Sequence, residues 1–528
     1  MDKIKNIIRK YKLIPCAVMV FVLAVAAYFV KWYRYGDIAG KYGGDVIFFY
    51  RYYDIIAVAF IAAAVLIFFL VFVKKSQIHR IYLAACIALG IIFSLVITPG
   101  AGADESNHLY HVVGYVNGIT GVGDTGQEGT YYVRRSYAEL ELGQDISVEN
   151  YIKTAKNFFS LSKGDANDMV EIESDVYNYS PAAVVLYLPA ILGILAGRAL
   201  SLGGVLTYML ARLFMAAVYS VLTYIALKKI PVGKNVLALI MLLPMMTSRV
   251  ACISEDCVLY AVIFLYIAYV MNAVFSERVI RPHEAAVMVC AGVFMAAFKG
   301  GIYIPLLLLM FLIPKQNFGN SMKYPAVVAC AVLLAVVVFG AVNYNIFIDV
   351  AASGAGSENE LMWTDSEGYT LRRMFTHPKE AACMLFNTIF FMGGTHYSEM
   401  LASGFGWLQI YTSAFPTAAF TVLLTLSLLN TEGKEICFGG KQRAISLIAV
   451  FLSIFIIVIS MWIFWTPVGS SHIVGIQGRY FIPLLFAALY PLKNRRCIIK
   501  KDIGGALVLA AVLFHIVIFW EIYIRIAV

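Results

Sequence analysis

Long apolar runs alternate with short polar segments along the whole chain. A helix of about 20 apolar residues crosses the bilayer core, and a helix satisfies its own backbone polar groups there. The pattern therefore predicts an all-α integral membrane protein with about thirteen transmembrane helices. We expect these helices near residues 13–30, 55–73, 81–97, 206–227, 235–250, 257–275, 284–298, 301–313, 324–347, 409–429, 444–465, 479–492 and 505–527.

One further apolar run, 182–200, is expected to lie at the outer membrane interface. If this run crossed the membrane, Lys228, Lys229 and Lys234 would fall on the outer side, against the positive-inside rule. The alternative is that 182–200 spans and that another segment restores the parity. The runs 284–298 and 301–313 are short and are joined by Lys-Gly-Gly, which predicts broken or tilted helices.

Composition narrows the class of protein. The chain has 528 residues, of which 61% are hydrophobic and only 14% are charged, which excludes a soluble globular protein. The net charge of +9 is spread over short clusters between apolar runs, so it does not indicate nucleic-acid binding. The nine cysteines form no Cys-x-x-Cys pair, which favours packing roles over zinc or disulfide sites. No small-residue cleavage site follows the first apolar run, so we expect a retained helix.

Charge also predicts orientation. Seven polar segments hold more than half of the 41 Lys and Arg, and the positive-inside rule places them in the cytoplasm together with the N-terminus. Acidic residues outnumber basic ones in 98–180 and in 349–408, which are expected to be two large outer loops. The chain is therefore expected to form one polytopic domain, 1–528, in a cytoplasmic membrane. The basic segments are 2–12, 74–80, 228–234, 277–283, 315–323, 432–443 and 493–501.

With this threading, unusual polar residues gather at the outer ends of the predicted helices. Charged groups near hydrocarbon are costly unless they face protein or a wet cavity, so one shared outer cavity would explain them together. The alternative for each residue is that it only caps a helix or reaches into the headgroup region. These residues are Asp104, Glu105, His108, Arg249, Glu255, Asp256, Lys299, His396, Glu399, Trp407, His472 and Arg479.

Carboxylates beside cations at a membrane surface suit one chemistry well. A carboxylate can act as a general base toward a hydroxyl group, and arginine can bind a phosphate through two hydrogen bonds. A lipid-linked phosphosugar would place its tail in the bilayer, its phosphate at the headgroup level and its sugar outside. A fixed arginine would then stabilise the charge that grows on the departing phosphate. A transporter cavity could hold the same groups.

Seven short segments, in order, resemble the motifs of one protein family. They are ADESNHLYHVVGYVNG, YSPAAVVLYLPAILG, ARL at 211–213, ISEDCVLYA, KGGIYIP, GFGWLQ and GIQGRYFIP. The chain resembles a large bacterial family of polytopic membrane proteins that is related to the GT-C glycosyltransferase superfamily. The resemblance runs from about residue 90 to 490, and the Gly-x-Gln-Gly-Arg-Tyr-Phe-x-Pro segment is its most specific part.

The resemblance implies a GT-C-like fold and an inverting glycosyltransferase that uses a polyprenyl-phosphate-linked sugar. It implies that Asp104 is the base, with Glu105 beside it in the acidic motif of the first outer loop. Relatives usually have proline directly before this Asp, and this chain has Ala103, which leaves the approach of the loop less constrained.

The resulting hypothesis is a glycosyltransferase of the bacterial inner membrane that modifies an envelope glycan, lipid or protein. Arg479 is the predicted phosphate ligand, with Lys299 or Arg249 as a second. No cofactor is required, although Asp104 and Asp256 could bind a divalent cation. The expected partners are the donor lipid, the acceptor and membrane lipids, and no nucleic acid. Further site candidates are His108, Asp256, His396, Trp407, His472 and Gln477.

Two rival hypotheses remain open. One is a transporter or flippase for lipid-linked glycans, which would more often carry charges at the bilayer midplane. The other is a non-catalytic protein of envelope assembly that uses its outer loops as a binding surface. The sequence leaves open the sugar, the acceptor, the linkage and the oligomeric state.

Overall fold

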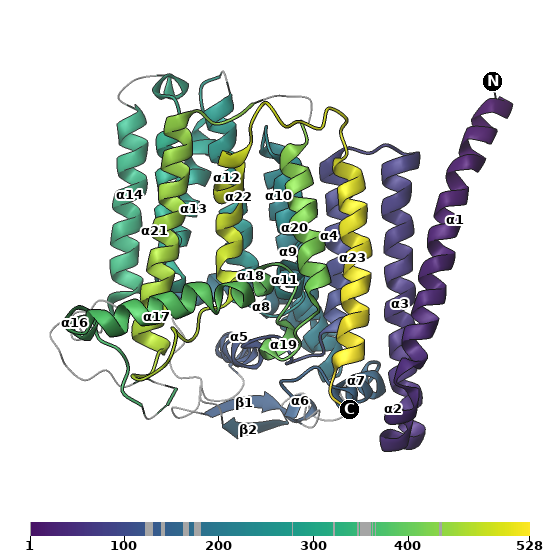
Figure 1. The fold of residues 1–528 in the computed structure, drawn as a ribbon. Coiled ribbons are helices and arrows are strands. Elements are labelled where there is room, and N and C mark those ends of the chain that lie inside the picture. The colour runs from purple at the N-terminus through teal and green to yellow at the C-terminus, as the bar shows by residue number, and fades with distance from the viewer. Residues whose placement is uncertain are drawn as a thin grey trace.

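The computed structural model is a bundle of long helices with a layer of shorter elements at one end (Figure 1). It describes residues 2–528 except 122–129, 139–142, 162–167, 174–180, 277, 320–322, 346–347, 349–360, 362, 365 and 432–435. Parts of both predicted outer loops thus lie outside the described residues. The N-terminus and the C-terminus lie at opposite ends of the bundle (Figure 1).

The elements of the bundle are mostly long α-helices, with shorter 3₁₀ or π stretches where helices break. They are α1 (Asp2–Tyr33), α2 (Tyr35–Tyr42), η1 (Gly43–Asp45), α3 (Val46–Phe68), η2 (Phe69–Val73), α4 (Ile78–Val96), α9 (Gly204–Lys229), α10 (Lys234–Met241), α11 (Pro244–Val250), α12 (Glu255–Phe275), α13 (Pro282–Ala297), η4 (Lys299–Gly301), η5 (Ile304–Leu312), η6 (Lys315–Phe318), α14 (Lys323–Val342), α20 (Ala414–Leu429), α21 (Gly440–Trp465), η7 (Gly478–Leu484), α22 (Leu485–Leu489), η8 (Tyr490–Leu492) and α23 (Gly504–Arg525).

Eight segments among the described residues are long and apolar enough to cross a membrane, which confirms a helical multi-pass membrane protein. Three further predicted spans coincide with the shorter apolar helices α13 and α20 and with the run Gly478–Leu492. The last two coincide with α10–α11 and with η4–η5. The total of thirteen stays a prediction. The eight segments are Leu13–Tyr33, Tyr35–Val73, Ile78–Val96, Gly204–Lys229, Glu255–Phe275, Tyr324–Val342, Gly440–Trp465 and Gly504–Arg525.

The breaks in the shorter spans have local causes. Pro244 begins α11, and Leu243 before it has extended backbone (ψ 142°), so α10 cannot continue through it. Between α13 and η5, Gly300 (φ 57°) and Gly301 (φ 68°) have left-handed backbone, which confirms the predicted break at Lys-Gly-Gly.

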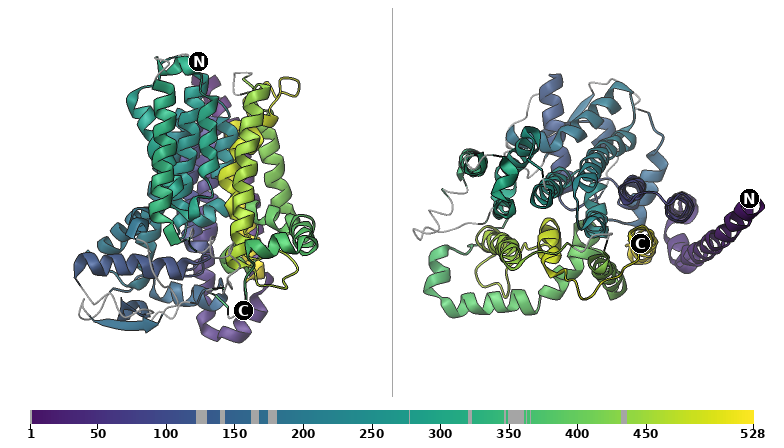
Figure 2. Two further views of the ribbon diagram at one scale, coloured as in Figure 1. Left: turned by 90° about the vertical axis from the view of Figure 1, so that its left-hand side faces the viewer. Right: turned by 90° about the horizontal axis from the view of Figure 1, so that it is seen from above.

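α12 is the central helix of the bundle. In its most apolar window 72% of residues are buried, against 6% for α1 and 11% for the segment in α14. The outer position of α1 and α14 is visible from above (Figure 2). α12 is therefore the most enclosed of the eight long apolar segments, and α1 and the segment in α14 are the most exposed.

The shorter elements gather at one end of the bundle, which we call the loop-rich end (Figures 1 and 2). Both predicted outer loops contribute to it, as expected, but they are largely folded. A small antiparallel sheet, β1–β2, adds to the expected all-α architecture. The elements are α5 (Glu105–Thr120), β1 (Thr130–Arg134), α6 (Arg135–Ala138), α7 (Val148–Asn157), β2 (Met169–Glu173), η3 (Pro181–Ala183), α8 (Val184–Ala199), α16 (Leu371–Thr376), α17 (Pro378–Phe390), α18 (Gly393–Leu401) and α19 (Phe405–Leu408).

The predicted interfacial run 182–200 forms η3 and α8. Near its start Tyr187 contacts His108, and near its end Arg198 Nη2 donates to Asn117 Oδ1 over 3.0 Å. Both ends of α8 thus meet the same helix, α5, at the loop-rich end. This course is the one expected of a helix that does not cross the bundle.

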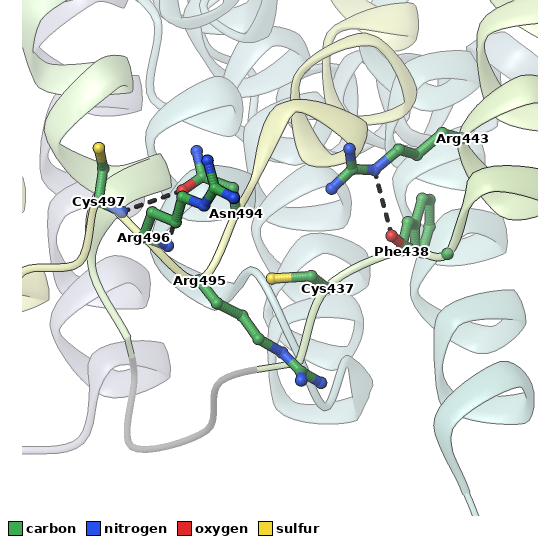
Figure 3. A pocket seen from close by; sticks show the side chains of 8 residues that line it. Cys437, Phe438, Arg443, Asn494, Arg495, Arg496 and Cys497 are labelled. Atoms are coloured by element: carbon green, nitrogen blue, oxygen red, sulfur yellow. Dashed lines mark hydrogen bonds between the residues drawn. The ribbon is translucent and has the colours of Figure 1, made fainter.

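Basic side chains mark the opposite end, which we call the basic end. Lys228 and Lys229 close α9 there, and Lys493 follows η8. A cavity of about 670 Å³ lies at this end where α21 begins (Figure 3). It is lined by Cys437, Phe438, Gly439, Arg443, Asn494, Arg495, Arg496 and Cys497.

Candidate functional site

Asp104 directly precedes α5, after the turn that follows α4, and its side chain makes no capping hydrogen bond with this helix. Its backbone is left-handed (φ 61°), which is uncommon outside glycine and is tolerated best by Asn and Asp. The preceding Gly102 has no room for a side chain, because a Cβ there would lie 2.6 Å from Cys252 Sγ. The tight turn therefore fixes where Asp104 points, and its side chain remains 40% exposed.

Arg479 contacts Asp104 although the two residues are 375 positions apart in the sequence. Its Nη2 donates to Asp104 Oδ2 over 2.8 Å, and its Nε lies 3.4 Å from Asp256 Oδ2. The Arg479 side chain is only 7% exposed. Within the described part of the chain, its Nε has no hydrogen-bond acceptor of good geometry. One guanidinium group therefore bridges two carboxylates.

Gly478 brings Arg479 to this position. A Cβ on Gly478 would lie 2.3 Å from both the His396 oxygen and the Met400 nitrogen of α18, so only glycine fits. The Gly478 N–H also donates to Glu399 Oε2 over 3.1 Å. The backbone before Arg479 is thus pressed against α18 and anchored to it.

Asp256 and Lys299 complete the ion pairs. Asp256, in the first turn of α12, is 2% exposed and contacts Lys299 Nζ through Oδ1. Lys299 is 17% exposed, has left-handed backbone (φ 50°), and its Nζ lies 4.9 Å from the centre of the Tyr480 ring. Ion pairs and a cation–π contact therefore hold Lys299 next to Arg479.

Arg249 approaches the same turn from α11. Its Nη1 donates to the Ala103 carbonyl over 3.1 Å, and the residue is 1% exposed. The structure thus joins Asp104, Asp256, Lys299 and Arg479 through ion pairs and places Arg249 beside them through the Ala103 carbonyl. We call these five residues the ion-pair cluster.

Burial alone would raise the pKa of Asp104, but the positive charge of Arg479 and its hydrogen bond outweigh that effect. The pKa of Asp104 therefore lies below its usual value, and its carboxylate is ionised at neutral pH. Arg479 also lies between Asp104 and Asp256, so a cation shared by these carboxylates would have to displace it. No group of three or more His, Cys, Asp or Glu suited to a metal ion occurs in the described ranges.

Glu105, predicted to share the catalytic role, has a different environment. It is fully buried and forms two hydrogen bonds with Arg212 of α9, Nε to Oε1 over 2.8 Å and Nη2 to Oε2 over 2.6 Å. Its oxygens also accept the N–H groups of Gly102 (3.1 Å) and Ile253 (2.8 Å). With both oxygens doubly engaged and no access to solvent, Glu105 suits a structural role and not that of a base.

Arg212 is the residue that sequence reasoning missed. It is fully buried and also donates to the carbonyls of Ser94 (2.9 Å), Ile97 and Thr98 (2.8 Å), which end α4 and begin the Asp104 turn. A lone charge inside the apolar run of α9 is costly without a partner, and that was the available signal. The Glu105–Arg212 pair therefore fixes the turn that carries Asp104.

His108 belongs to the surroundings of the ion-pair cluster. Its Nδ1 is 2.5 Å from the Tyr187 hydroxyl, which donates to Glu255 Oε1 over 3.1 Å. The other site candidates lie outside these ion pairs. His396 Nδ1 is 3.4 Å from Glu399, and His472 Nδ1 is 3.0 Å from the neighbouring Ser471 hydroxyl.

Gln477 and Trp407 were also predicted at the site. Gln477 directly precedes Gly478, and its Oε1 is buried without a hydrogen bond among the described residues; the same holds for Trp407 Nε1. No described hydrogen bond or ion pair joins either of them to the ion-pair cluster. The cavity at the basic end (Figure 3) is also separate, and its Arg443 donates to the carbonyls of Phe438 and Lys493, both over 3.1 Å.

Comparison with known proteins assigns the chain to a family. A family model described as "Predicted membrane protein (DUF2142)" matches residues 86–488. The chain belongs to this family. The matched region includes all five residues of the ion-pair cluster and the Glu105–Arg212 pair. No curated protein and no solved structure shows a significant match to the chain.

Proposed function

We propose that the protein is a GT-C-type inverting glycosyltransferase that transfers a sugar from a polyprenyl-phosphate donor to an acceptor in the cell envelope. The observation that carries the proposal is the contact between Asp104, a partly exposed carboxylate, and Arg479, a buried cation from the Gly-x-Gln-Gly-Arg segment. Their contact lies at one end of an apolar bundle, where a lipid-borne phosphate would meet the protein. The proposed reaction face is the outer side of the membrane.

Asp104 would act as the general base. Arg479 occupies its Oδ2, which leaves Oδ1 for the acceptor hydroxyl. The hydroxyl oxygen attacks the anomeric carbon while its proton passes to Asp104, and the bond from that carbon to the phosphate oxygen breaks on the opposite side. The sugar configuration is therefore inverted, and the polyprenyl phosphate leaves.

Arg479 and Lys299 would stabilise the departing phosphate. Both are already held in place by Asp256, so they need little reorganisation when negative charge grows. Arg249 supports the turn through Ala103 and adds positive charge nearby. A phosphate and Asp104 would share Arg479, which couples donor binding to the position of the base.

The test is a transfer assay with the purified full-length protein in lipid nanodiscs. A panel of short-chain polyprenyl-phosphate hexoses and pentoses is supplied with an envelope extract as acceptor, and release of polyprenyl phosphate is measured. We expect release with at least one donor, and its loss in Asp104→Asn. Donor movement across liposome membranes without any consumption would overturn the proposal in favour of a transporter.

A further inference from the structure

A line of three side chains begins beside Asp104 and leads away from the ion-pair cluster. His108 of α5 contacts Tyr187 of α8 at 2.5 Å, and Tyr187 donates to Glu255 of α12 over 3.1 Å. His108 lies one helical turn after Asp104, and its backbone N–H donates to the Asp104 carbonyl over 3.0 Å. Three elements distant in sequence thus form one hydrogen-bonded line.

The chemistry of these groups fixes their donors and acceptors. The Glu255 carboxylate only accepts, so the single proton of the Tyr187 hydroxyl points to it. The Tyr187 oxygen must then accept from His108, which places the imidazole proton on Nδ1. A neutral imidazole carries one such proton, so Nε2 of His108 has a free lone pair.

The surroundings keep this imidazole neutral and fixed. Burial lowers the pKa of His108 to about 3, although the charges of Asp104 and Asp256 act to raise it; Lys299 and His111 add to the lowering. The His111 ring stacks on the Tyr187 ring, with centres 6.0 Å apart and planes 8° from parallel. Burial also lowers the pKa of His111 to about 4, so this neighbour is neutral too.

We propose that His108 relays the proton that Asp104 takes from the acceptor. Tyr187 and Glu255 hold the His108 imidazole in the Nδ1–H form, which leaves Nε2 able to accept that proton. The relay rests on the proposed function of Asp104, but the assignment of the tautomer does not. After transfer, the proton on Asp104 passes to His108 Nε2, the Nδ1 proton passes to the Tyr187 oxygen, and the Tyr187 proton passes to Glu255. One proton moves from Asp104 to Glu255, Asp104 is again ionised, and His108 carries its proton on Nε2 until Glu255 releases its proton and the Nδ1–H form returns.

The tautomer can be measured without any substrate. Full-length protein with ¹⁵N-labelled histidine, in nanodiscs at neutral pH, is studied by NMR, and His108→Gln identifies the His108 signals by their loss. We expect a protonated Nδ1 and an unprotonated Nε2. Tyr187→Phe should replace this single form by a mixture of both tautomers. A protonated Nε2 in the wild type, or an unchanged spectrum in Tyr187→Phe, would overturn the proposal.

Tyr266→Phe is the matched control. Tyr266 lies on α12 as Glu255 does, and its buried hydroxyl donates to the Leu306 carbonyl over 3.1 Å, away from His108. Its removal costs a comparable hydrogen bond and should leave the His108 signals unchanged. Thermal unfolding of both variants separates a loss of fold from a change of tautomer.

The transfer assay then tests the relay itself. Tyr187→Phe should lower turnover by about 10-fold and His108→Gln by roughly 10- to 100-fold, with the KM for donor unchanged, because the groups act on proton transfer and not on binding. Full turnover of Tyr187→Phe at every pH, in a preparation whose wild type transfers sugar, would overturn the relay. If the wild type consumes no donor, the proposed function fails while the NMR result still decides the tautomer.

Discussion

Two ion pairs begin at adjacent residues and differ in almost every physical respect. Glu105 and Arg212 are both fully buried, and every carboxylate oxygen and guanidinium nitrogen of the pair has a partner. Asp104 is 40% exposed, and Arg479, its partner, is shared with Asp256. The first pair is closed and the second is open.

The difference indicates that the two neighbouring carboxylates, Asp104 and Glu105, have different roles. A satisfied, buried pair cannot exchange protons or bind a ligand without large cost, so it holds the backbone. An exposed oxygen beside an incompletely satisfied guanidinium group can do both. The residues of the closed pair therefore determine where the open pair stands, and the open pair carries the proposed chemistry.

Among these predictions, breaking the closed pair should have the largest effect on the stability of the fold. Arg212→Met removes the partner of buried Glu105 and leaves three carbonyls unsatisfied, which should destabilise the protein by about 3–5 kcal/mol. The measurement is thermal unfolding in detergent together with the yield of folded protein. Arg525→Met, at a 46% exposed pair, is the control and should change stability little. Equal stability of both variants would show that the closed pair is not structural.

Breaking the open pair should affect activity far more than folding. Asp104→Asn keeps the size of the side chain and the left-handed backbone but removes basicity, so transfer should fall by about 10²–10⁴-fold while the variant still folds with a slightly lower Tm. Asp168→Asn, an exposed ion-pair residue at the same end, should transfer normally. If Asp104→Asn transfers normally and Glu105→Gln is inactive although folded, the roles of the two carboxylates are reversed.

The guanidinium group of the open pair should matter beyond its charge. Arg479→Lys keeps a cation near Asp256 but loses the planar fork, which should lower donor turnover by roughly 10²–10³-fold and leave the KM for acceptor unchanged. Arg443→Lys at the basic end is the matched control. Equal kinetics for wild type and Arg479→Lys would remove Arg479 from the donor site.

Acid should weaken the open pair by a small amount. Because the folded pKa of Asp104 is depressed, its stabilising contribution is present above the unfolded value of about 3.9 and is lost as the pH falls through the folded pKa. The difference in Tm between wild type and Asp104→Asn should therefore be constant near neutrality and close below about pH 4. A difference that persists unchanged to pH 3 would contradict the depressed pKa.

Sequence reasoning reached the open pair but not the closed one. Asp104 follows Gly102 by two residues and Arg479 directly follows Gly478, and the chemistry of the two side chains predicted that they face one outer cavity. Arg212 and Tyr187 lie inside apolar runs, where only the packing of α9 and α8 against α5 shows which polar group each one meets. His472 and Trp407 carried the same polar signal as Arg479, but no described hydrogen bond or ion pair connects them to it.

For the fold too, local features could be predicted from the sequence and contacts between distant segments could not. Hydropathy and the lysine clusters predicted the bundle and the break at Gly300, because these depend on local residue properties. The β1–β2 sheet pairs residues about 40 positions apart through backbone hydrogen bonds, and no local pattern distinguishes such a pairing from other loop courses.

The parts of the chain before and after the family segment, residues 86–488, pack against each other. α3 lies before residue 86 and α23 after residue 488, yet Tyr53 packs on Phe519 with ring centres 5.2 Å apart. Arg34 also donates to the carbonyls of Ile524 (3.0 Å) and Ile526 (2.6 Å). In evolutionary terms, this packing makes the two flanks depend on each other. Substitutions in one flank should therefore be compensated in the other, and chimaeras between relatives should exchange both flanks together.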